Sequence, residues 1–115
     1  MGRPDALVKL RRSSRGEGIM SDMAITHHAT AQGGEFVATV PGEAATGQLT
    51  YSMRGSVMVA DHTLVPAAIG GRGVAGRLVD ALIAHARDKG LTIEPQCSYV
   101  AAAFKRHPEW ADLLA

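Results

Sequence analysis

The chain has 115 residues, of which 46% are hydrophobic and 20% are charged, and its formal net charge is +1. This length accommodates one domain with a substantial core, and the near balance of charge gives no basic face of the kind that nucleic acid requires. A single cysteine excludes an internal disulfide, and no apolar run approaches the roughly 20 residues of a membrane span. We therefore expect a cytoplasmic protein that binds neither nucleic acid nor membrane.

Residues 1–22 differ in composition from the rest of the chain. The segment MGRPDALVKLRRSSRGEGIMSD carries five basic side chains and one short apolar patch, without a periodic apolar face. Such a segment buries too little surface to offset the entropy lost on ordering. We predict a disordered tail over residues 1–22 and one folded domain over residues 23–115.

Four predicted strands follow, each marked by alternating apolar and polar residues. The pattern is clearest in GEFVATVPG and GQLTYSMRG, where Phe36 and Ala38, then Leu49 and Tyr51, fall on one face. The run MAITHHAT precedes these two, and SVMVADHTLVP follows them and ends at Pro66. Because glycine-containing turns separate the runs, we expect an antiparallel meander.

The spacing of the apolar residues then changes to that of a helix. Val74, Leu78 and Leu82 recur on one stripe, and Gly90 stands where a left-handed C-terminal cap is expected. LTIEPQC predicts a fifth strand, SYVAAAFKRH a short second helix, and PEWADLLA a last helical turn that starts at Pro108. The order of elements predicts an α+β fold, a mostly antiparallel sheet with two main helices.

Glycines surround Arg72 between the fourth strand and the long helix. A helix N-terminus exposes unpaired N–H groups and the positive end of its dipole, and both favour anions. Gly71 and Gly73 would let a ligand approach the backbone, and the Arg72 guanidinium suits phosphate. The same glycines also fit a turn that needs them for geometry alone. The loop lacks the Lys-Ser or Lys-Thr pair of a nucleoside triphosphate site.

Three blocks in order resemble the GNAT superfamily of acyl-CoA-dependent N-acetyltransferases, and more closely its short YjdJ-type branch. They are HTLVP from His62, GGRGVAGRLVDALIAHA from Gly70, and PQCSYVAAAFKRHPEWADLL from Pro95. The resemblance spans about Ile25 to Leu114 and implies a minimal GNAT fold. It departs from the superfamily at Gly70, where the loop usually begins with Gln or Arg.

The resemblance also implies acetyl-CoA as cosubstrate and an amine acceptor, either a small molecule or a protein. It implies that the end of the fourth strand, Leu64 and Val65, binds the pantetheine amides. The loop residues implied to hold the CoA pyrophosphate are Gly71, Arg72, Gly73, Val74, Ala75 and Gly76. Larger family members insert helices between the first two strands, where this chain has only a turn. The acceptor site should therefore be open in a monomer, or completed in a weak homodimer.

Three side chains near the expected thioester are candidates for the chemistry, and no His or Cys cluster has the spacing of a metal site. The family commonly places a tyrosine acid where Tyr99 stands. Cys97 could accept the acyl group as a nucleophile or pack as a small hydrophobic residue. His62 could act as a base or bond within the sheet, and strand alternation predicts that it faces away from Asp61. We expect direct attack of the amine on the thioester; the alternative is a CoA-binding module with little or no catalysis.

Overall fold

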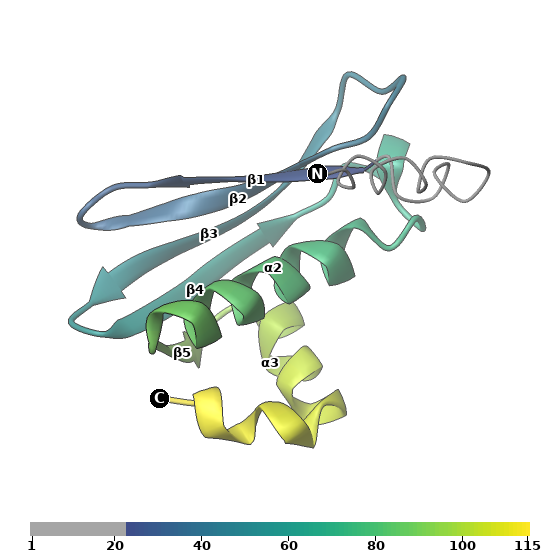
Figure 1. Ribbon diagram of the computed structural model, residues 1–115. Helices are drawn as coiled ribbons and strands as arrows, with labels where there is room; N and C mark the ends of the chain where they lie inside the picture. Colours follow the sequence, from purple (N-terminus) through teal and green to yellow (C-terminus); the bar gives the residue numbers. More distant parts are fainter. Residues whose placement is uncertain (1–22) are drawn as a thin grey trace, which may run out of the picture.

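The computed structural model describes residues 23–115 (Figure 1), and the tail predicted over residues 1–22 lies outside the described residues. Five strands form one sheet in the order β1-β2-β3-β4-β5. Strands β1 to β4 pair antiparallel, and β5 is parallel to β4, which confirms the predicted mostly antiparallel sheet. The strands are β1 Ala24–Ala29, β2 Gly33–Thr39, β3 Thr46–Arg54, β4 Val57–Leu64 and β5 Thr92–Pro95.

Two α-helices and two 3₁₀ helices complete the described domain. The long helix α2 (Val74–Lys89) connects β4 to β5, because two parallel strands need a crossover connection of this kind. Helix α3 (Ser98–Arg106) follows β5. The 3₁₀ helices are η3 (Ala67–Ile69), which precedes α2, and η4 (Pro108–Leu113), which follows α3. This order confirms the predicted α+β fold with two main helices.

The core lies between one face of the sheet and the helices. Phe36 of β2 and Leu49 and Tyr51 of β3 are at most 6% exposed, and they share the core with Leu78 and Leu82 of α2. These are the residues that strand alternation and helical spacing predicted. Burial of such apolar side chains supplies most of the free energy that favours folding.

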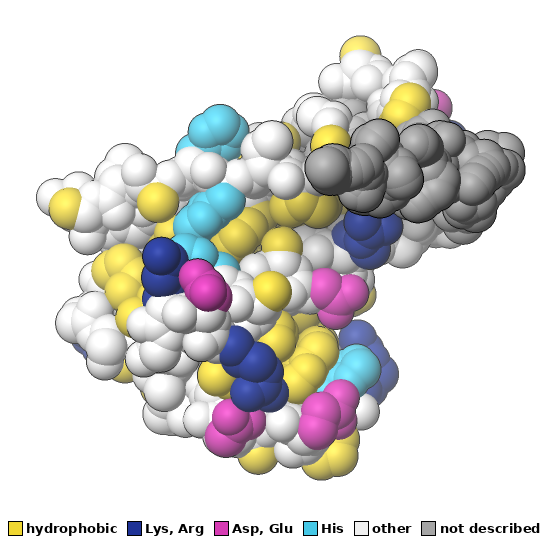
Figure 2. Space-filling model, viewed as in Figure 1, with side chains coloured by type: hydrophobic (Ala, Val, Ile, Leu, Met, Phe, Trp, Pro, Cys, Tyr) yellow, Lys and Arg dark blue, Asp and Glu magenta, His cyan; other side chains and the backbone are white. Residues whose placement is uncertain are grey.

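The opposite face of the sheet, which we call the outer face, is polar along β3 and also carries Val37, Val59 and Leu64 on the neighbouring strands. On β3 it carries Gln48, Thr50 and Ser52, which alternate with the core residues and are half-buried or exposed. On the side of the molecule shown in Figure 2, basic and acidic side chains stand in small separate groups. No helix in residues 23–115 is long and apolar enough to cross a membrane.

A close contact fixes the start of α2 against β3. A Cβ added to Gly47 would lie only 2.7 Å from Val74 Cγ1, so a larger residue would push the helix away from the sheet. Val74 itself is only 2% exposed. Because β3 starts at Thr46, this contact also holds the turn between β2 and β3 beside the first turn of α2.

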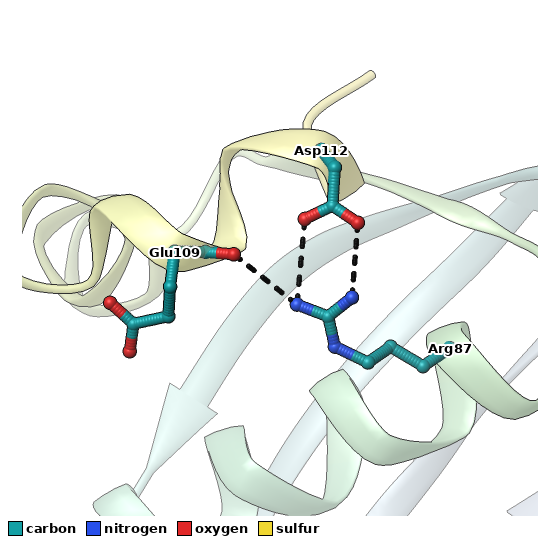
Figure 3. Close-up of polar contacts among 3 residues, drawn as sticks. All are labelled: Arg87, Glu109 and Asp112. Carbon is teal, nitrogen blue, oxygen red and sulfur yellow. Dashed lines mark hydrogen bonds and ion pairs between the residues drawn. The ribbon is translucent and has the colours of Figure 1, made fainter.

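The other end of α2 is held by the C-terminal segment (Figure 3). Arg87 Nη1 lies 3.0 Å from Asp112 Oδ2, and Arg87 Nη2 donates to the Glu109 carbonyl at 3.4 Å. Leu114 forms a parallel bridge with Ile93 and so covers the free edge of β5. These contacts close the C-terminal end of α2.

Candidate functional site

The glycine loop before α2 presents backbone donors without partners. Gly71 and Gly73 both have a φ of +76°, a left-handed conformation that favours glycine, and Gly73 is the N-cap of α2. Backbone hydrogen bonds donated along this segment stop with the N–H of Gly70 and resume with that of Arg77. Among the described residues, no carbonyl accepts a hydrogen bond from the N–H groups of residues 71–76. These donors, at the positive end of a helix, form a cradle for an anion.

The cradle also has the space that a ligand needs. Within residues 23–115, a Cβ added to Gly71 or Gly73 would meet no atom within 4 Å beyond its chain neighbours, and the same is true of the turn glycines Gly42, Gly55 and Gly90. The positive φ values explain why glycine stands at both positions. The start of any helix leaves about four N–H groups unpaired, here those of residues 73–76, and Gly71 and Arg72 add two more donors before the helix. Together these donors could bind an anion.

Arg72, between the two glycines, is engaged in an ion pair. Its Nη2 lies 3.1 Å from Oε2 of Glu43, in the turn between β2 and β3, and the two side chains are 47% and 30% exposed. An ion pair at this exposure contributes about 1 kcal/mol or less. The sequence offered no signal for this pair, because 29 residues separate its partners.

Strands β4 and β5 separate beyond Ala60. The Ala60 carbonyl accepts hydrogen bonds from the N–H groups of both Gln96 and Cys97, each at 2.9 Å, and the parallel pairing stops there. Residues 62–64 pair with β3 alone, so within the described chain their other edge is open. Leu64, at the end of this edge, is 60% exposed. An extended ligand that carries amides could add to such an edge through main-chain hydrogen bonds.

Cys97 stands at this opening as the N-cap of α3, and it is half-buried. Its Sγ lies 3.3 Å from Thr63 Oγ1, although the thiol makes no regular capping hydrogen bond. Burial raises the pKa of the Cys97 thiol, but the Thr63 hydroxyl and the backbone N–H groups of Val100, Tyr99 and Thr63 outweigh it. The pKa therefore lies below its ordinary value. Sequence reasoning selected Cys97 but missed Thr63, which reads as an ordinary strand residue.

Tyr99 reaches from the start of α3 toward the start of α2. A Cβ added to Gly76, in the first turn of α2, would lie 4.0 Å from Tyr99 Oη. On its other side, the Arg106 guanidinium lies 5.7 Å from the centre of the Tyr99 ring. The Tyr99 hydroxyl thus lies close to the first turn of α2, and its role as an acid stays a prediction.

His62 and Asp61 share a face, so the prediction from strand alternation is wrong. The pairing of β3 with β4 shifts between Thr50 and Tyr51, so Asp61 and His62 both lie opposite Thr50 as a β-bulge. Thr50 Oγ1 donates to Asp61 Oδ1 at 2.7 Å, which places Asp61 on the outer face, and His62 lines a cavity there beside Thr50. No hydrogen bond joins Asp61 to His62 in the part of the chain that the structure describes.

This cavity of about 310 Å³ adjoins the opening between β4 and β5. It is lined by Gln48, Thr50, His62, Thr63 and Leu64. Thr63 also contacts Cys97, so the cavity on the outer face and the opening meet at this residue. Across residues 23–115, no three His, Cys, Asp or Glu side chains gather closely enough to hold a metal ion.

The sequence model of the family described as GCN5-related N-acetyl-transferase matches residues 35–113. Because the match covers more than half of the chain, the protein belongs to this family, whose general chemistry is acetyl transfer from an acyl-CoA. This confirms the predicted GNAT superfamily, whereas the short YjdJ-type branch stays a prediction. No curated protein shows significant similarity to the chain.

Proposed function

We propose that the protein is an acetyl-CoA-dependent N-acetyltransferase that transfers the acetyl group directly to an amine. The observation that carries this proposal is the loop over residues 71–76, whose N–H groups have no partner among the described residues and which follows the open edge of β4 in the chain. The loop suits a diphosphate and the edge suits an extended arm with amide groups, and CoA has both. Family membership supports the same assignment.

Each predicted cofactor residue has a role in this arrangement. The backbone N–H groups of residues 71–76 would hold the diphosphate, with the Arg72 guanidinium adding charge. Leu64 and Val65 would offer main-chain groups to the pantetheine arm, because β4 has no partner strand on that side within the described residues. The reacting end of the arm would then come to the opening beside Cys97 and Tyr99.

Bound acetyl-CoA supplies an acetyl thioester, whose carbonyl carbon the amine attacks and whose sulfur leaves as a thiolate. Tyr99 is the candidate acid for that thiolate, since its hydroxyl lies between the starts of α2 and α3. The amine must be neutral to attack, and it loses a proton as the new bond forms. His62, exposed in the outer-face cavity, would accept that proton directly or through water.

Cys97 is close enough to this chemistry to compete for the acyl group. Its lowered pKa increases the fraction of thiolate at neutral pH, which favours nucleophilic attack. Transfer to Cys97 would only exchange one thioester for another and would gain no driving force. We therefore assign Cys97 to the wall of the opening, where its thiol contacts the Thr63 hydroxyl.

Two substitutions separate direct attack from a Cys97 intermediate. We expect Tyr99→Phe to lower kcat by roughly 10²-fold or more, the usual scale for a lost general acid, while Cys97→Ala keeps most of the activity. The measurement is steady-state acetyl transfer from acetyl-CoA to a panel of amines that includes polyamines and lysine peptides. Complete loss of transfer in Cys97→Ala, with an acetylated Cys97 that turns over at the overall rate, would contradict direct attack.

A non-catalytic CoA-binding module is the second candidate function. Only residues 30–32 join β1 to β2, so the chain has no helices at the place where larger family members build an acceptor pocket. A module of this kind would be stabilised by CoA, since a ligand that binds only the folded state raises the melting temperature. It would nevertheless transfer acetyl to no amine in the panel.

A further inference from the structure

Glu43 forms an ion pair with Arg72, the arginine whose guanidinium is proposed to bind phosphate of the cofactor. The carboxylate of Glu43 and the Arg72 side chain meet at 3.1 Å, directly beside the loop of free donors. A carboxylate and a phosphate oxygen make the same charge-assisted hydrogen bond to arginine. Glu43 therefore stands in for the anion in the free protein.

The turn that carries Glu43 is held in place. Its Glu43 N–H donates to the Val40 carbonyl at 3.0 Å, after Gly42 with a φ of +81°. The contact between Gly47 and Val74 fixes the following strand against the first turn of α2. The packing of β3 against α2 therefore brings Glu43 and Arg72 together.

Glu43 is the charged residue near the loop that opposes binding of an anionic ligand, because the other charges there are positive. Arg72 and Arg77 are basic and exposed, and α2 carries no acidic residue in its first turn. Of the described carboxylates, Glu43 is the one that forms an ion pair with the loop. A diphosphate bound there would have to share the N–H donors of the Arg72 guanidinium with Glu43. The negative charge of the Glu43 carboxylate would also repel it.

We propose that Glu43 is an intramolecular competitor for Arg72, which it must release when the diphosphate of CoA binds. The inference rests on the proposed function, because the competing anion is the CoA diphosphate. It assigns a residue of the β2–β3 turn, outside the loop, to the control of cofactor affinity. Removal of the Glu43 charge should tighten CoA binding, and most of this gain should require Arg72.

The test is a double-mutant cycle read by isothermal titration with CoA, without any acyl transfer. We expect Glu43→Gln to tighten CoA binding about threefold to tenfold, on the scale of an exposed ion pair plus the removed repulsion. Glu43→Ala should tighten binding similarly. In an Arg72→Gln background the same changes should tighten binding less, because only the direct repulsion between Glu43 and the diphosphate is then removed. The gain in wild type should shrink at high salt.

Asp112→Asn is the matched control, because it removes one carboxylate from an exposed arginine pair at the far end of α2. Its CoA affinity should equal that of the wild type. An unchanged or weaker affinity in Glu43→Gln, with CoA bound by the wild type, would overturn the inference and leave the proposed function intact. Weaker binding in Glu43→Ala with unchanged binding in Glu43→Gln would show that Glu43 only orients Arg72. Absence of CoA binding in every variant would overturn both proposals.

Discussion

Both ends of α2 have a glycine in the left-handed conformation, but the backbone groups are satisfied at one end and unpaired at the other. Gly73 at the N-terminal end has a φ of +76°, and Gly90 at the C-terminal end has a φ of +68°. At the C-terminal end the N–H groups of Gly90 and Leu91 both donate to the Ala86 carbonyl, so the chain satisfies its own helix. At the N-terminal end the donors of residues 71–76 have no partner within the described chain.

The surroundings sharpen this difference. A hollow at the C-terminal end is lined by Arg87 and Asp112, but these two groups are paired with each other, and Glu109 adds a second contact. At the N-terminal end the free groups are backbone donors, and the N-cap residue Gly73 has no side chain that could accept from them. A left-handed glycine therefore stands at each end of α2, and at the N-terminal end the backbone donors have no partner among the described residues.

The largest expected effect comes from a matched pair of substitutions, Gly73→Val and Gly90→Val. Both place a β-branched residue at a positive φ, so each should cost about 1–3 kcal/mol of folding free energy. Only Gly73→Val should also abolish the rise in melting temperature caused by saturating CoA, because its side chain fills the approach to the cradle. Thermal melting of both variants with and without CoA measures the two effects together. Equal loss of the CoA effect in both variants would show that general destabilisation, and not the cradle, is responsible.

A smaller effect should follow pH and should come from a histidine that faces the C-terminal half of α2. His27 Nε2 lies 2.7 Å from Tyr51 Oη, its ring stacks on Phe36 at 4.2 Å, and it meets His85 of α2 edge-on at 4.5 Å. Burial lowers the pKa of His27, and the charges of His85 and His28 lower it further. The unfolded chain therefore binds a proton at His27 more readily than the folded chain does.

The sign of the pH dependence follows from this difference in proton binding. Stability should fall as pH drops through about 6.5, the ordinary histidine pKa, and the loss should level off below the lowered folded pKa of His27. Urea unfolding between pH 8 and pH 5 measures the slope. His27→Gln keeps a polar partner for Tyr51 and should flatten the curve. An unchanged slope in that variant would assign the pH dependence to other groups.

The smallest effect should come from breaking the ion pair at the closed end of α2. Arg87→Ala removes an exposed contact with Asp112, so it should cost about 0.2–1 kcal/mol of folding free energy. CoA affinity should stay at the wild-type value, since the pair is separated from the loop by the length of the helix. Urea unfolding gives the first quantity and titration the second. A marked loss of CoA affinity would show that the two ends of α2 are coupled.

Much of the fold could be predicted from the sequence because local patterns determine it. Alternation identified Phe36 and Leu49 as core residues, and glycines at positions 73 and 90 marked both ends of α2. The site was predictable where it depends on a continuous segment, as in the loop of residues 71–76. Family resemblance, rather than composition or spacing, supplied the identity of the ligand.

The parts of the site that escaped prediction depend on contacts between distant segments. The β-bulge that turns Asp61 and His62 to one face arises from the pairing of β4 with β3, and alternation along one strand cannot show it. The contact of Cys97 with Thr63 spans 34 residues, and no pattern in the sequence connects them. The pairing of Glu43 with Arg72 likewise follows from the packing of a turn against a helix.

We propose that the N-terminal end of α2 binds the diphosphate of CoA through its backbone N–H groups. An NMR titration measures this directly. Amide ¹H–¹⁵N resonances of the protein would be followed as CoA is added. We expect the amide resonances of Gly71, Gly73 and Gly76 to shift with a common binding curve. Those of Gly90 and Leu91, at the C-terminal end, should not shift. If saturating CoA leaves the three loop amides unshifted, or shifts only the amides at the C-terminal end, then the loop does not bind the diphosphate.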